Sequence, residues 1–144
     1  MKFNPLSEVA YRRKLTENYL KEAEESFLRG DHRHTVESSQ LMVENAAKAV
    51  IAFYRIPSSS HDPSMELLEL LEQLPRGLMV KAERLAEIVH KLAPEHGRVT
   101  YGEPTRGVTP WELYNKNDAE EALILAKECM KLLEETLKGI HVKP

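Results

Sequence analysis

The sequence of 144 residues lacks the features that mark disulfide-rich, secreted or membrane proteins. Its one cysteine, Cys129, excludes an internal disulfide and fits a reducing compartment. No apolar run approaches the roughly 18 residues of a membrane-spanning helix. Residues 1–10 lack the apolar segment of a signal peptide. We therefore expect one cytoplasmic domain, residues 1–144, that does not enter a membrane.

Motifs for phosphate cradles, zinc sites and nucleophilic catalysis are absent as well. The sequence has no Gly-x-Gly-x-x-Gly, no phosphate-loop glycine–lysine pair, no Cys-x-x-Cys, no His-Glu-x-x-His and no glycine-flanked serine. The net charge of −3 provides no strong basic field for nucleic acid. From the residues alone we expect no cofactor and no metal site, and no activity is identified.

The apolar residues that are present recur with helical spacing. This pattern predicts about five amphipathic helices joined by short links, which favours an all-α, up-and-down bundle with a core of about residues 8–138. The expected helices span about 8–29, 32–54, 63–74, 78–92 and 119–137.

Turn and cap residues mark the expected boundaries. Gly30 suits the end of the first helix, Asp31 the N-cap of the second, and Asn117-Asp118 the N-cap of the last. In the second helix, Glu44 precedes Lys48 by four residues, a spacing that predicts an exposed helix edge beside closely packed alanines.

Residues 93–111 hold three prolines and three glycines and lose the helical spacing, so we expect a long structureless loop. Here Arg98 could bind a phosphate and Tyr101 could stack on a base, close to the imidazole of His96. The alternative is structural: Tyr101 and Trp111 pack the loop onto the bundle, and Arg98 caps a helix.

Histidines near arginines are a further candidate for chemistry. His32 and His34, next to Asp31, could bind a divalent metal, but side chains two apart on a helix point about 200° apart and cannot share one ion. This cluster is therefore better explained as a helix start that Asp31 caps. Arginine precedes histidine by five or six residues at Arg29–His34, Arg55–His61 and Arg84–His90. Such a pair could cleave RNA without metal, the histidine moving a proton and the arginine stabilising phosphate charge. Arg84 and His90 would point about 120° apart on one helix, so a structural role is the alternative.

The order of features from about residue 8 to 138 resembles the HEPN family (higher eukaryotes and prokaryotes nucleotide-binding domain). The matching features are Gly30-Asp31, then Glu44 with Ala46-Ala47 and Lys48-Ala49, then His61-Asp62, a leucine-rich third helix, Arg98-Val99-Thr100-Tyr101 and Asp118-Ala119.

The resemblance implies a helical bundle that forms a homodimer and often accompanies a small nucleotidyltransferase in a toxin–antitoxin pair. It also implies that many members are metal-independent ribonucleases with an Arg-x4-6-His motif completed across the dimer. Arg84 and His90 match this motif, although Leu85 stands where active members have a polar residue. Arg98 and Tyr101 match the arginine–tyrosine turn of nucleotidyltransferase-associated members, and we expect them to contact nucleotide.

Three hypotheses follow from the sequence. The chain is a nucleotide-associated, dimeric partner of a small nucleotidyltransferase, a metal-independent endoribonuclease that uses Arg84 and His90, or a non-catalytic scaffold. In each case we expect any nucleotide or RNA ligand at the segment that carries Arg98 and Tyr101.

Overall fold

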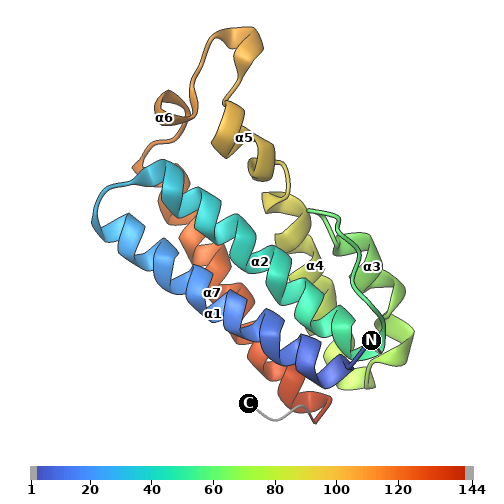
Figure 1. Cartoon of the computed structure of the whole chain (residues 1–144). Helices are drawn as coiled ribbons and strands as arrows, with labels where there is room; N and C mark the ends of the chain where they lie inside the picture. Colours follow the sequence, from blue (N-terminus) through green and yellow to red (C-terminus); the bar gives the residue numbers. More distant parts are fainter. Residues whose placement is uncertain (1–2, 142–144) are drawn as a thin grey trace.

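The computed structural model describes residues 3–141, which form an all-α bundle as predicted (Figure 1). Its α-helices are α1 (Pro5–Leu28), α2 (His32–Tyr54), α3 (Ser64–Glu69), α4 (Met79–Leu92), α5 (Glu95–Tyr101), α6 (Pro110–Leu113) and α7 (Lys116–Gly139). Single 3-10 turns lie at Leu71–Gln73 (η1), Arg76–Leu78 (η2) and Pro104–Arg106 (η3). Within the described range no strand is present, and none of the helices is both long and apolar enough to cross a membrane.

The apolar faces of α4 and α7, which the helical spacing predicts, pack on α2. Leu85 and Ile88 of α4 and Leu133 of α7 are fully buried there, together with Met42 and Ile51 of α2. This core joins elements that lie far apart in the sequence, and α1 covers one of its sides by packing on α2 and α7 (Figure 1).

α2 occupies the centre of the bundle, a position that its own sequence pattern does not reveal. The elements that pack against it are α1, α3, α4, α5, α6 and α7. Nearly every side chain from Thr35 to Ala52 is therefore buried, polar ones included. Glu44 and Lys48 are only 5% and 4% exposed, so the predicted exposed edge is wrong. The four-residue spacing does produce an ion pair, but neighbouring helices enclose it.

The expected caps locate most helix ends to within a few residues. Asp31 caps α2 as predicted, because its carboxylate accepts a hydrogen bond from the amide of His34. α7 begins before the expected position: Asn115 is its N-cap, and Asp118 completes a capping box with it. The leucine-rich third helix is shorter than predicted and continues as the turns η1 and η2.

Residues 93–111 are not the structureless loop that the sequence predicts. They form α5, η3 and the start of α6, and they project beyond one end of the bundle (Figure 1). Gly102 permits the reversal within this projection, since its φ is +65° and a Cβ there would lie 2.2 Å from the carbonyl oxygen of Val108. Helices of one or two turns contain too few residues for a helical period to be recognised, which explains the wrong prediction.

Candidate functional site

Arg84, the arginine of the predicted nuclease pair, is fixed to α7 by hydrogen-bonded ion pairs. Its Nε and Nη2 donate to the two carboxylate oxygens of Glu128 at 2.7 and 2.9 Å, and its Nη1 donates to Glu87 at 3.2 Å. The bonds to Glu128 raise the pKa of Arg84 and lower the pKa of Glu128. In the isolated chain this guanidinium is therefore already engaged with protein carboxylates.

His90, the histidine of the same pair, contacts a different element. Its Nδ1 lies 2.8 Å from Oδ2 of Asp62, just before α3, and its side chain is 75% exposed. Burial acts to raise the pKa of Asp62, but hydrogen bonds from Ser64 and His90 outweigh it and lower that pKa. A carboxylate that holds Nδ1 leaves the Nε2 of the neutral ring as an exposed base.

The structure does not bring Arg84 and His90 together within one chain. One side chain is bound to α7 and the other to the segment before α3, in keeping with their separation around the α4 axis. Beside His90, a hollow of about 390 Å³ lies between α3 and α4. Apolar atoms form most of its lining, with Met65, Leu68 and Ala86, and the acidic residues Asp62, Glu83 and Glu87 also border it.

The other two arginine–histidine pairs do not form either. Arg55 donates to the backbone carbonyl of Glu66 and to the carboxylate of Glu69, away from His61. Arg29 donates to Ser26 at the end of its own helix.

Arg33, in the predicted capped helix start, attaches the projection to the bundle. Its Nη1 donates to the carbonyl oxygen of Val99 in α5 at 2.9 Å, and its guanidinium lies 5.4 Å from the ring centroid of Trp111 in α6. Trp111 therefore has part of the structural role that the sequence suggested as an alternative. Trp111 is nonetheless 73% exposed, as is Tyr101, so neither aromatic side chain is buried against the bundle.

Arg98, an expected nucleotide contact, is surrounded by carboxylates. Its Nη1 donates to both carboxylate oxygens of Glu95 at 3.1 and 2.8 Å, and its Nη2 lies 3.7 Å from Glu103. The adjacent hollow of about 180 Å³ is lined by more acidic than basic side chains, namely Glu95, Asp118 and Glu121 against Lys91 and Arg98. A phosphate binding here would have to displace or outcompete these carboxylates.

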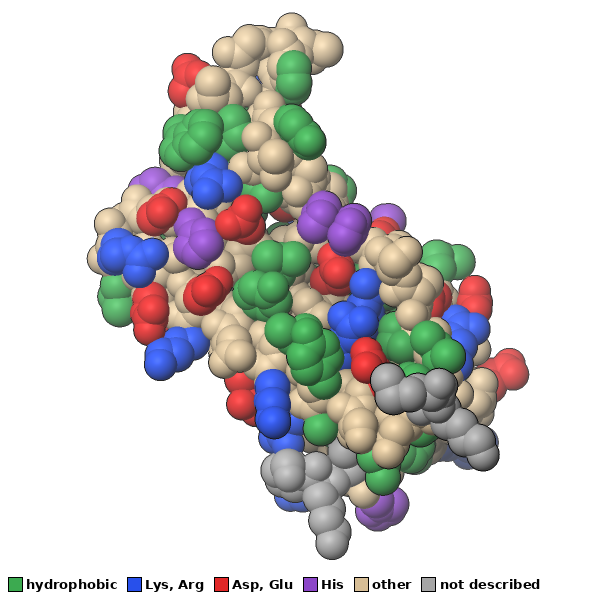
Figure 2. Space-filling view, viewed as in Figure 1, with side chains coloured by type: hydrophobic (Ala, Val, Ile, Leu, Met, Phe, Trp, Pro, Cys, Tyr) green, Lys and Arg blue, Asp and Glu red, His purple; other side chains and the backbone are tan. Residues whose placement is uncertain are grey.

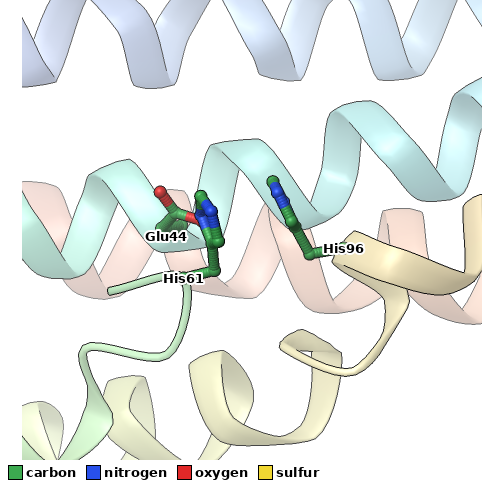
Figure 3. Close-up of side chains that lie close together, drawn as sticks. All are labelled: Glu44, His61 and His96. Atoms are coloured by element: carbon green, nitrogen blue, oxygen red, sulfur yellow. The ribbon is translucent and has the colours of Figure 1, made fainter. Parts of the chain in front are cut away.

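A cluster of Glu44, His61 and His96, which the sequence does not reveal, forms where the projection meets the bundle (Figure 3). Glu44 comes from α2, His61 from the link before α3 and His96 from the first turn of α5. The two imidazole rings are stacked, with centroids 3.6 Å apart and planes 17° apart. Figure 2 shows histidine side chains at the surface below the projection, with acidic and basic side chains spread over the same face.

A buried polar network on α2 holds the two histidines of the cluster. Glu44 accepts hydrogen bonds from Lys48 at 3.2 Å and from the amide nitrogen of Gln40 at 3.1 Å. The amide oxygen of Gln40 therefore faces His96, whose Nδ1 lies 3.0 Å from it. The Nδ1 of His61 lies 3.1 Å from Oε1 of Glu44. Both rings are thus held through Nδ1, which leaves the lone pair of each neutral ring on Nε2.

One sequence signal could have indicated this network. Gln40, Glu44 and Lys48 recur every four residues in the helix richest in small apolar residues, so they share one side of it. When such a helix is buried on all sides, a polar stripe must find partners inside the protein. Which histidines provide them depends on chain segments that no local pattern connects.

Comparisons with known proteins agree with the fold. The HEPN domain family model matches residues 10–136. The chain is also similar to the crystal structure of TT1696 from Thermus thermophilus, with 22% sequence identity, a TM-score of 0.62, and coverage of 90% of this chain and 98% of that one. At that identity the likeness shows a common fold. No curated protein matches the sequence. Because the family model covers most of the chain, this protein belongs to the HEPN domain family.

Proposed function

We propose that this HEPN domain is a cytoplasmic, nucleotide-associated homodimer that acts as the partner of a small nucleotidyltransferase in a toxin–antitoxin pair. One observation supports a partner over a stand-alone nuclease: the carboxylates of Glu128 and Glu87 hold Arg84 on the side of α4 away from His90. A phosphate would have to displace the carboxylates from Arg84, and His90 would have to approach from another chain.

The partner role is tested by co-expression with a small nucleotidyltransferase encoded beside this chain. We expect the two proteins to copurify through affinity capture and gel filtration, and the transferase to modify or silence this chain. Failure of such a neighbouring enzyme to bind, at concentrations of tens of micromolar, would contradict the partner role. If the chain then dimerises but binds no nucleotide or RNA, it is a scaffold.

The hollow between α3 and α4 supports the homodimer. It is mainly apolar, and Met65 and Leu68 at its edge are 66% and 38% exposed. A second copy placed there would remove this surface from water and would bring another α4 near His90. Light scattering should give twice the chain mass, and Met65→Glu should shift it toward the monomer. Leu28→Glu, at an 85% exposed position of α1, is the matched control.

We place the nucleotide at the projection, with Arg98 and Tyr101 as direct contacts. Titration with ATP should show affinity that falls by about 1–3 kcal/mol in Arg98→Ala, the scale of a charge-assisted hydrogen bond. Tyr101→Ala should also weaken binding by removing an exposed aromatic surface. Arg106→Ala, another arginine bound to Glu103, is the control. If both variants bind ATP as the unmodified chain does, this placement is wrong.

The second candidate function is a metal-independent endoribonuclease, and the contact between His90 and Asp62 favours it. An exposed imidazole oriented by a carboxylate is suited to proton transfer. Cleavage of single-stranded RNA in EDTA, lost in His90→Ala and in Arg84→Ala but retained in His34→Ala, would establish this activity. Growth arrest on expression of the chain alone would point the same way. Absence of cleavage supports the partner role.

A further inference from the structure

We propose that Glu44, His61 and His96 bind a single Zn²⁺ ion where the projection meets the bundle. One carboxylate oxygen and one nitrogen from each ring lie within 4.8 Å of one another (Figure 3). Glu44 comes from α2, His61 from the link before α3, and His96 from α5, so only the folded chain brings them together.

The donor set has the chemistry that Zn²⁺ prefers. Two imidazoles and one carboxylate form a known class of site with three protein ligands and one position open to water. With metal–ligand bonds of about 2.0–2.2 Å in tetrahedral geometry, the ligand atoms of such a site lie roughly 3.3–3.6 Å apart. In the structure the Nδ1 of His61 is hydrogen-bonded to the Oε1 of Glu44 at 3.1 Å, so His61 must turn to offer a nitrogen lone pair to an ion beside that carboxylate.

The stacked rings must turn to face a common ion, and His61 has the freedom to do so. It lies on the link between α2 and α3, and its side chain is 56% exposed. The cluster is therefore open to solvent on the His61 side. A water molecule or a small anion can reach the fourth position from there.

Residues behind the ligands already have the arrangement of an outer coordination shell. Lys48 binds Oε2 of Glu44 and leaves Oε1 toward the histidines. Gln40 links Oε1 of Glu44 to Nδ1 of His96. Partners of this kind fix the orientation of metal-binding side chains. Because Lys48 balances the charge of Glu44, the dication favours a hydroxide or another anion as its fourth ligand.

Zn²⁺ itself is the probe, added to chain that has been stripped with EDTA and then freed of chelator. Calorimetry and competition with a coloured zinc indicator should show one ion per chain. His61→Ala and His96→Ala should each weaken binding by at least about tenfold. Substitution with Co²⁺ should give the visible absorption of a four-coordinate site, and either variant should lose it.

His34→Ala is the matched control, since His34 also contacts carboxylates but lies outside the cluster. It should bind Zn²⁺ as tightly as the unmodified chain. Circular dichroism should show that each variant folds. Of the two ligand variants, His61→Ala should disturb the fold less, because His61 lies at an exposed position on a link. The proposal is overturned if Zn²⁺ does not bind stoichiometrically, or if His61→Ala and His96→Ala bind it unchanged. Neither measurement depends on nuclease activity or on a nucleotidyltransferase.

Discussion

Replacing Lys48 with methionine tests whether the buried ion pair on α2 stabilises the fold. The side chains of Lys48 and Glu44 are 5% and 7% exposed, and Nζ lies 3.2 Å from the carboxylate. Methionine has a similar length and fits the same space, but it leaves the carboxylate of Glu44 inside the bundle without a cation. Removing one partner of a buried pair costs about 3–5 kcal/mol because the remaining charge is uncompensated.

The structure places the expected loss at the lower end of that range. Glu44 keeps the hydrogen bonds from Gln40 and His61, which continue to stabilise its charge. We therefore expect the free energy of unfolding to fall by about 3 kcal/mol. For a domain of this size, such a loss lowers the melting temperature by roughly 9 °C. Urea unfolding followed by circular dichroism measures the first quantity, and calorimetry measures the second.

A double-mutant cycle separates the pair from other effects of the substitution. Adding Glu44→Gln to Lys48→Met removes the unpaired charge and should recover about 2 kcal/mol. Lys127→Met, at an exposed position of α7, is the control and should change stability by no more than about 0.5 kcal/mol. The reasoning is refuted if Lys48→Met loses less than about 1 kcal/mol, or if the double variant is no more stable than the single one.

Three further predictions concern the turn, the acid response and the thiol. Gly102 has φ +65° and a Cβ there would meet backbone, so Gly102→Ala should lower the free energy of unfolding by more than about 1 kcal/mol and make the projection sensitive to proteolysis. Gly107→Asn is the control and should have neither effect, because Gly107 has φ +68° but open space around it. The pKa of Asp62 is lowered in the folded state, so its contribution to stability is complete above about pH 4 and is lost as the pH falls. In urea unfolding, the stability of Asp62→Asn should therefore decline less toward about pH 3 than that of the unmodified chain. An equal decline in stability would contradict this prediction. Burial and, to a smaller extent, the charge of Glu128 raise the pKa of the Cys129 thiol. A thiol reagent should therefore modify Cys129 rapidly only after the chain is denatured. Fast labelling of the native chain would show that α7 opens.

For the candidate site, the sequence identified individual residues better than their neighbours in space. The spacing of Arg84 and His90 indicated that they point apart on one helix, and their different partners agree with that geometry. In the sequence His61 belongs to a candidate arginine–histidine pair and His96 to an expected loop, and no local pattern connects the two. Their stacking in the structure depends on how α5 and the link before α3 dock on α2, which no local pattern specifies.

The sequence by itself determined the all-α class, the approximate positions of the long helices, and the faces of α4 and α7 that enter the core. Helical period and capping are local properties, so a window of a few turns contains them. Tertiary structure decided that α2 lies at the centre, and therefore that Glu44 and Lys48 are buried rather than exposed. It also decided that Glu44 meets His61 and His96. Burial and convergence depend on the packing of segments far apart in the chain, and that information is absent from any single segment.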